Sequence, residues 1–215
     1  MKRIPIVLTI LFLVCASARA ANVDEVLSGL QSYWTTIDTF TARFVQKKHL
    51  TLLSGDVTSR GTFAYKKPGI MSWRYDPPED MIMGIKPGLI TLYYPGIKKA
   101  RRIHLSPGAD VPLWTSFGMG PISDIGALKD AAAVTVTDTN GVTVLTFAPK
   151  DTKEAIKRIA VSLKKDYTPL AVRITERNGD FTALEFSDQR ANPPVDNTLF
   201  EVKIPAGVAV EDIGR

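Results

Sequence analysis

The sequence is poor in the residues that most often do chemistry. Among its 215 residues there are one cysteine and two histidines. An internal disulfide is therefore excluded, and His49 and His104 stand in none of the spacings typical of a metal site or a catalytic triad. Motifs for a serine nucleophile, a phosphate-binding loop and a dinucleotide site are absent as well. We expect no catalytic residue, no metal and no cofactor.

Long hydrophobic runs are also lacking, since no apolar run reaches the ~18 residues that a membrane-spanning helix needs. The longest, residues 4–14, follows Lys2 and Arg3 and precedes Ala18-Arg19-Ala20. A basic start, a short apolar stretch and small residues are typical of a secretory signal cleaved after Ala20. We therefore divide the chain into a signal peptide, residues 1–20, and a single domain, residues 21–215. A retained membrane anchor is one alternative, and a lipid on Cys15 is another.

The exported chain also lacks a large net charge. The predicted signal takes with it three of the 27 basic residues and none of the 22 acidic ones, which leaves a surplus of only two. A nucleic-acid-binding protein needs a stronger basic field, so we expect no nucleic-acid partner. The only cysteine also leaves with the signal, and export without disulfides suits a bacterial periplasm.

The exported chain begins with a helical pattern. Apolar residues at spacings of three and four indicate one amphipathic helix, with Asn22 as a candidate cap. The members of this stripe are Val23, Val26, Leu27, Leu30, Tyr33, Trp34 and Ile37. The helix either serves core packing alone or covers an apolar surface of the fold.

After Asp38 the apolar period becomes two, which indicates strands. Alternating runs occur at residues 40–45, 58–65, 70–75, 81–85, 89–94, around 103, 133–138, 142–147, 158–163, 170–176, 181–186 and 200–204. Asn140-Gly141 and Asn178-Gly179 predict hairpins. Residues 106–130 are irregular, with room for short helices. A mainly β fold follows, in which a long antiparallel sheet curls and its concave apolar face needs a cover.

Two charged clusters each allow two interpretations. Lys98, Lys99, Arg101 and Arg102 form either a solvated edge or a docking surface for an acidic partner or an anionic head group. The carboxylates at 76, 79 and 80 flank two prolines, and they form either a solvated turn or, less plausibly, the site of a hydrolase.

Large flexible apolar side chains are abundant around the predicted strands. Methionine adapts its shape and suits surfaces that accept varied apolar partners. The residues concerned are Phe63, Tyr65, Met71, Trp73, Met81, Met83, Tyr93, Tyr94, Trp114 and Phe117. Composition alone favours an ordinary core beneath a curved sheet over a surface that binds apolar ligands.

Three stretches of the chain resemble the outer-membrane lipoprotein carrier family, LolA. The first contains Phe44-Val45-Gln46, Gly61-x-Phe63 and Lys67-Pro68-Gly69-x-Met71-x-Trp73-x-Tyr75-x-x-Pro78. The second contains Gly88, Leu92, Tyr94 and Pro95. The third contains Asn192, Val195, Phe200, Val202, Pro205, Gly207-Val208 and Val210. Residues 100–158 match weakly.

The resemblance implies a fold and a role. The implied fold is an incomplete β-barrel (α+β, mainly β) covered by helices over an apolar cavity. The implied role is that of a periplasmic chaperone that takes acylated lipoproteins from an inner-membrane ABC transporter and passes them to a receptor lipoprotein at the outer membrane. We expect no enzyme activity, and we expect a monomer.

The same resemblance assigns residues to these tasks. The lipid-binding cavity and its cover are expected to involve Leu30, Trp34, Phe63, Tyr65, Met71, Trp73, Met83, Tyr94, Leu113, Trp114 and Phe117. The family's functional arginine falls on Lys67, which keeps the charge but loses the planar fork. Because Lys67 has the parity of Phe63 and Tyr65, we expect its amine to bond backbone carbonyls of the cover.

Other interpretations remain open at this stage. A related carrier of another acylated lipid or of a glycolipid, serving a dedicated export system, fits the same residues. A regulatory sensor or structural module on the same fold is a further alternative.

Overall fold

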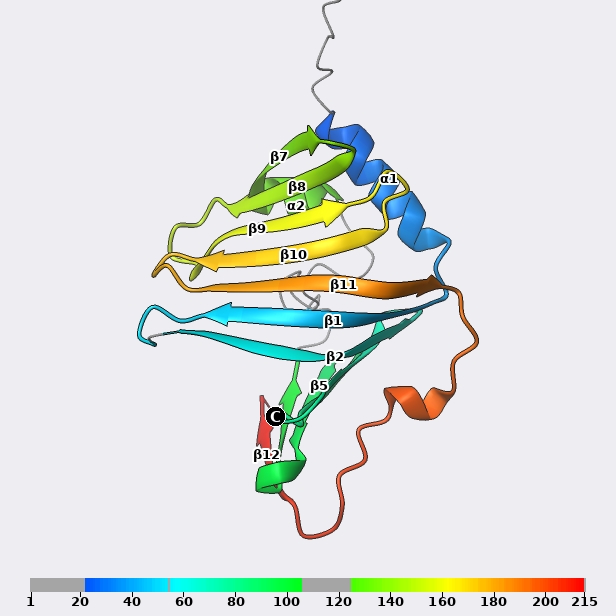
Figure 1. The fold of residues 1–215 in the computed structure, drawn as a ribbon, viewed down its shortest axis with the longest axis vertical. Coiled ribbons are helices and arrows are strands. Elements are labelled where there is room, and N and C mark those ends of the chain that lie inside the picture. The colour runs from blue at the N-terminus through cyan, green and yellow to red at the C-terminus, as the bar shows by residue number, and fades with distance from the viewer. Residues whose placement is uncertain (1–21, 54, 106–124, 215) are drawn as a thin grey trace, which may run out of the picture.

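The computed structural model describes residues 22–53, 55–105 and 125–214. These residues form one curved sheet of twelve strands with helices against it (Figure 1). The helices are α1 (Val23–Thr35), α2 (Ile125–Ala131) and two 3-10 turns, η1 (Pro95–Ile97) and η2 (Asn197–Phe200). The strands are β1 (Thr39–His49), β2 (Asp56–Lys66), β3 (Ile70–Tyr75), β4 (Ile82–Lys86), β5 (Leu89–Tyr94), β6 (Lys99–His104), β7 (Ala132–Thr139), β8 (Val142–Pro149), β9 (Ile156–Leu163), β10 (Pro169–Glu176), β11 (Phe181–Ala191) and β12 (Ala209–Ile213). In the ranges described, every helix is too short or too polar to cross a bilayer.

The sheet is open, as predicted. Its strand order is β12-β6-β5-β4-β3-β2-β1-β11-β10-β9-β8-β7. The neighbours pair antiparallel, except that β12 runs parallel to β6. In Figure 1, β5 and β12 run at a steep angle to β1 and β11, and the outer strands β7 and β12 lie at opposite ends of the molecule. The sheet thus curves strongly without closing, which is the incomplete barrel that the sequence led us to expect.

Alternation along the strands places the apolar side chains on the concave face. On β1, Phe40, Ala42 and Phe44 are buried, while Arg43 and Val45, which have the opposite parity, are exposed. The same rule holds along β2 and β3, whose inward side chains continue the layer. Ser72 is buried too, although it has the opposite parity, because the segment after β11 covers that part of the outer face.

The two Asn-Gly hairpins differ in their turns. Asn140 and Gly141 both have positive φ, 55° and 78°, and form the predicted two-residue loop between β7 and β8. At the second hairpin only Gly179 has positive φ, and the loop spans residues 177–180. There the Asn178 side chain accepts a hydrogen bond from the Asp180 backbone N–H at 3.0 Å, which favours the longer loop.

The predicted last strand at residues 200–204 is wrong. That segment begins as η2 and continues without pairing to the sheet, whereas the last strand is β12. Its backbone is held by a side chain instead, because the Arg74 guanidinium donates to the carbonyls of Leu199 and Glu201 at 3.2 and 3.1 Å. Val202 packs so closely on Gly84 that a Cβ at residue 84 would lie 2.6 Å from its Cγ2 atom.

Helix α1 begins at its predicted cap and lies on the concave side. The Asn22 side chain accepts a hydrogen bond from the Asp24 backbone N–H at 2.9 Å. The buried stripe consists of Val26, Leu27, Leu30 and Trp34. Gly29 lets the helix approach Tyr167, because a Cβ at residue 29 would lie 2.0 Å from a ring carbon of that side chain.

We predict that Gly29→Ala lowers the free energy of unfolding by about 1–3 kcal/mol, because overpacking outweighs the gain in helix propensity. In a Tyr167→Ala background, which removes the ring, the same substitution should instead stabilise by up to ~1 kcal/mol. Urea denaturation of the four proteins measures both effects. If Gly29→Ala changed the free energy of unfolding in the same direction in both backgrounds, contact with the Tyr167 ring would not be what sets the distance between α1 and that side chain.

Candidate functional site

Aromatic side chains from the helix and the centre of the sheet form one continuous layer. We call this set the aromatic layer: Trp34 of α1, Phe40 and Phe44 of β1, Phe63 and Tyr65 of β2, Trp73 of β3 and Phe186 of β11. The ring centroids of Phe63 and Trp73 lie 4.5 Å apart, and those of Phe44 and Trp73 lie 5.1 Å apart. Trp73, near the middle, is 0% exposed. The layer is part of the buried apolar cluster that the described residues form.

Helix α1 packs on the sheet through its buried stripe, in which Trp34 is the largest side chain. The indole of Trp34 lies 5.3 Å from the ring of Tyr65 and 5.8 Å from that of Phe40, centroid to centroid. Trp34 is 1% exposed, so its packing seals that part of the concave face. The cover and the layer are therefore held together by apolar contact, which a ligand of the same character can replace.

Desolvation disfavours charge in the layer and beside it. The phenol of Tyr75, which packs 5.0 Å from Phe44 between ring centroids, has its pKa raised to about 12 by desolvation. Burial also raises the pKa of Tyr65. Both phenols stay neutral at physiological pH, so the surface beneath α1 favours apolar groups over ions.

The structure brings together seven of the residues expected to bind lipid. All of them are buried in one apolar cluster: Leu30, Trp34, Phe63, Tyr65, Met71, Trp73 and Met83. Tyr94 lies apart from this cluster, half-buried at the end of β5, and lines a shallow pocket with Val210 of β12. Leu113, Trp114 and Phe117 lie outside the described residues.

Lys67 contacts the end of the cover. Its Nζ atom donates a hydrogen bond to the backbone carbonyl of Thr35 at 3.2 Å. The carboxylate of Asp38 is 3.9 Å from the same amine. Thr35 is the last residue of α1, where the helix dipole places partial negative charge. A half-exposed cation thus joins the rim of the aromatic layer to the C-terminal end of the helix that covers it.

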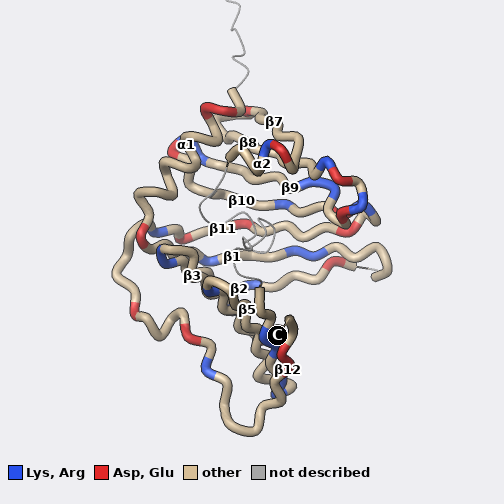
Figure 2. Tube along the Cα trace, turned by 180° about the vertical axis from the view of Figure 1, so that it is seen from behind, with Lys and Arg blue, Asp and Glu red and all other residues tan. Residues whose placement is uncertain are grey.

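The basic run does not form the sheet edge that we considered. Lys99, Arg101 and Arg102 lie on β6, and β12 pairs with β6 on its outer side. Arg101 donates to the Glu211 carboxylate at 2.8 Å, and Figure 2 shows acidic and basic residues side by side near β12. Lys98 and Lys99 are exposed. The neighbouring strand thus balances the charge of Arg101, whereas Lys98 and Lys99 are open to solvent.

Sequence reasoning missed an apolar pocket at the other end of the sheet. A cavity of ≈ 380 Å³ lies between α2 and strands β7 to β9. Its apolar lining consists of Leu128, Ala131, Ala132, Phe147, Pro149 and Ile159. The alternating pattern around Phe147 and Ile159 did predict inward-facing residues, but nothing in the sequence placed α2 over them.

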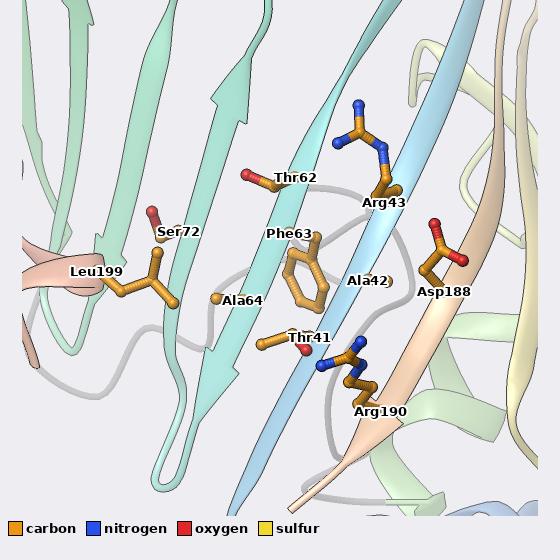
Figure 3. Close-up of a pocket in the computed structure, with 10 residues that line it drawn as sticks. All are labelled: Thr41, Ala42, Arg43, Thr62, Phe63, Ala64, Ser72, Asp188, Arg190 and Leu199. Carbon is orange, nitrogen blue, oxygen red and sulfur yellow. The ribbon is translucent and has the colours of Figure 1, made fainter. Parts of the chain in front are cut away.

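A second cavity, of ≈ 400 Å³, lies on the outer face of the sheet (Figure 3). Hydroxyl and charged groups take a large part in its lining, which includes Thr41, Arg43, Thr62, Ser72, Asp188 and Arg190. Arg43 also donates to Asp76 at 3.3 Å. With two guanidinium groups and a carboxylate at its rim, this pocket is poorly suited to an acyl chain.

The histidines take ordinary structural partners, and in the carboxylate cluster Asp76 accepts from Arg43. His49 lies 2.7 Å from Asp56 and stacks on Phe181, and His104 lies 3.0 Å from Asp212. Across the described ranges, His, Cys, Asp and Glu side chains form no cluster of three that could hold a metal ion.

Comparison with known proteins identifies the family. A sequence model of the family "Outer membrane lipoprotein carrier protein LolA" matches residues 35–203. The outer-membrane lipoprotein carrier protein of Cupriavidus necator is 26% identical over 205 residues, which span 93% of this chain and 92% of that protein. The corresponding protein of Pseudomonas entomophila is 24% identical over 197 residues, spanning 90% of this chain and 91% of that protein.

Solved structures show the same fold. An uncharacterized conserved protein from Thermus thermophilus superposes with a TM-score of 0.53 at 10% identity, covering 88% of this chain and 98% of that one. A MucA/MucB complex structure from Pseudomonas aeruginosa superposes with a TM-score of 0.50 at 14% identity, covering 85% of this chain and 62% of that one. The family match spans most of the chain and the sheet has the expected open form. The chain therefore belongs to the LolA family of outer-membrane lipoprotein carriers, whose members are chaperones rather than enzymes.

Proposed function

We propose that this protein is a periplasmic carrier that shields the acyl chains of lipoproteins in transit. It would receive them from an inner-membrane ABC transporter and deliver them to a receptor lipoprotein at the outer membrane. The observation that carries the proposal is the packing of α1, through Trp34, over a continuous apolar layer on the concave face of the sheet. Membership of the carrier family supports it.

The energetics set what the layer must do. Burying one CH₂ group is worth about 0.8 kcal/mol, so a chain of ~16 carbons represents on the order of 10 kcal/mol. A carrier must offset much of this cost and still release its cargo. A cover that packs on the empty layer meets both needs, because it shields the layer when cargo leaves and competes with cargo while it is bound.

The docked cover is imperfect, and this favours exchange. No described residue accepts a hydrogen bond from the buried indole N–H of Trp34. An unsatisfied buried donor costs about 1–3 kcal/mol. Opening of α1 lets water satisfy this group, so hydration of the indole offsets part of the free energy that opening requires.

The acyl chain is proposed to lie on the residues beneath α1. In this proposal Leu30 and Trp34 belong to the cover, while Phe63, Tyr65, Met71, Trp73 and Met83 form the floor. Leu113, Trp114 and Phe117 remain proposed parts of the cover, and Tyr94 a proposed contact at its margin. The pocket beneath α2 extends the apolar surface available to a second chain.

Lys67 is proposed to hold the closed state and thereby to assist release, since its amine bonds the end of α1. Lys98, Lys99, Arg101 and Arg102 are proposed to align the carrier with an acidic partner. Of these, Lys98 and Lys99 are the most available. Handover that is insensitive to salt and to reversal of these two charges would remove the run from the mechanism.

Depletion of the protein in its native host tests the function. We expect outer-membrane lipoproteins to remain in the inner membrane, as measured by membrane fractionation, and to return to the outer membrane on complementation with the wild type. N-terminal sequencing of the exported protein tests cleavage after Ala20 in the same strain. Correct sorting of lipoproteins after complete depletion would refute the carrier role.

One observation favours a second candidate. Lys67 occupies the position of the family's arginine, so the closed state is held differently, and a different cargo is consistent with that change. A carrier of another acylated lipid or of a glycolipid would share every apolar contact described above. Mass spectrometry of lipids that co-purify from the periplasm separates the two, because only one of them yields triacylated peptides.

A further inference from the structure

The hairpin between β1 and β2 concentrates the exposed apolar side chains of the molecule. Five of the eight large hydrophobic residues that are exposed in the described ranges belong to it: Val45, Leu50, Leu52, Leu53 and Val57. Leu52 is 96% exposed and Leu53 is 50% exposed. We call Leu50, Leu52 and Leu53 the leucine tip. Such a cluster at the end of a long hairpin is a marker of an interaction surface.

Residues 50–53, which include the leucine tip, form a hydrogen-bonded turn. The Leu53 backbone N–H donates to the Leu50 carbonyl at 2.8 Å and closes the turn. The carboxylate of Asp180, on the neighbouring β10–β11 loop, accepts from the Thr51 backbone N–H at 2.7 Å and from its hydroxyl at 2.9 Å. The hairpin end is therefore anchored to a second hairpin, and the anchor holds the leucines in an outward position.

Positive charge lies next to the leucine tip. Lys47 and Lys48 are exposed at its neck on β1, where Figure 2 shows basic residues close to the hairpin end. Lys47 and His49 share the carboxylate of Asp56, at 2.6 and 2.7 Å. Lys48 is not part of that ion-pair group, and Arg60 adds a further exposed cation on β2. Three cations, Lys47, Lys48 and Arg60, thus stand against two nearby carboxylates, those of Asp56 and Asp180, which leaves the neck with a small excess of positive charge.

We propose that the leucine tip inserts into the interfacial region of an anionic phospholipid bilayer. The three leucines stand on a convex end, and acyl chains close around a convex apolar group without a preformed groove. The lysines at the neck would then lie at the depth of the head groups, where their long stems accommodate the boundary and anionic lipid attracts them. This goes beyond carriage of cargo, because the contact requires neither a bound acyl chain nor a transporter.

Membrane binding through the leucine tip is expected to be weak. Only three aliphatic side chains enter the bilayer, and the aromatic ring at the neck, that of Phe181, is half-buried and stacks on His49. A reversible contact suits a protein that must also leave the membrane. The tip would hold the carrier at the surface long enough to meet a membrane-bound partner and would then release it.

Sedimentation with vesicles of phosphatidylethanolamine and phosphatidylglycerol, with no cargo present, tests the proposal. The wild type should co-sediment, and Leu52→Ser/Leu53→Ser should lower the partition coefficient roughly tenfold or more. Ile97→Ser is the matched control, since Ile97 is 65% exposed on η1, away from the hairpin; it should bind as the wild type does. Absence of wild-type binding, or equal binding by the double variant, would overturn the proposal.

Two further measurements identify the contact. Lys48→Glu should weaken binding to anionic vesicles and leave binding to phosphatidylcholine vesicles unchanged. When vesicles are added, the tryptophan fluorescence of Leu52→Trp should shift to the blue more than that of the wild type, and brominated lipid should quench it. Should the wild type instead self-associate through the leucine tip in sedimentation velocity and ignore vesicles, the tip is a protein interface and the membrane proposal fails. Loss of vesicle binding with lipoprotein sorting intact would separate this proposal from the carrier function.

Discussion

Replacing Trp34 with alanine is expected to release α1 from the sheet while most of the strands stay folded. Truncation of a buried tryptophan costs about 3–5 kcal/mol, and Trp34 provides the ring contacts that join α1 to Tyr65 and Phe40. A helix of 13 residues is marginal in water by itself. Once undocked, it should unfold locally, and amide hydrogen exchange in α1 should accelerate by roughly 10²–10³-fold.

Trp73→Ala is the matched control for this effect. Trp73 is as deeply buried as Trp34 but belongs to β3. Its truncation should lower the protection of β2 and β3 together with global stability. The Trp34 variant should instead leave β1, β2 and β11 close to their wild-type exchange rates. If α1 and the central strands lose protection together in the Trp34 variant, the helix is part of the core and cannot act as a separate cover.

The sequence was informative wherever side chains alternate on one apolar face. The stripe of α1 and the alternation in β1 to β3 predicted both the elements and the residues that meet beneath the helix. The family resemblance pointed to Lys67, and the parity argument placed it at the rim: two positions beyond Tyr65, its amine does bond a backbone carbonyl of the cover. Local periodicity was sufficient here because each strand pairs with its neighbour in the chain.

Alternation gave a wrong strand at residues 200–204, where the side chains alternate but the backbone pairs with no described strand. Residues 200–204 alternate, and Phe200, Val202 and Ile204 do line one cavity on the outer face. Their backbone, however, is held by Arg74 and not by a strand. Alternation reports which side chains face an apolar surface and says nothing about backbone partners. The pocket beneath α2 and the edge strand β12 depend on where distant segments return, which no local pattern encodes.

Lys67→Leu is expected to retain cargo and to hand it over slowly. The hydrogen bond from Lys67 to Thr35 is available only when α1 is docked, so it favours the empty, closed state. The side chain is half-exposed, and solvent screening limits the contribution to about 1 kcal/mol. A change of that size alters an equilibrium about fivefold. The fraction of cargo passed to an acceptor, followed in a purified transfer assay, should fall by a similar factor while uptake is unchanged.

Two substitutions determine whether handover depends on the hydrogen bond that Lys67 donates or on its ion pair with Asp38. Lys67→Arg keeps both and should deliver cargo at least as well as the wild type, since a guanidinium can also reach the end of α1. Asp38→Asn removes the carboxylate that lies 3.9 Å from the amine and is 80% exposed, so it should have little effect. Normal delivery by Lys67→Leu would remove Lys67 from the mechanism. Slow delivery by Asp38→Asn would transfer the role from the hydrogen bond with Thr35 to the ion pair.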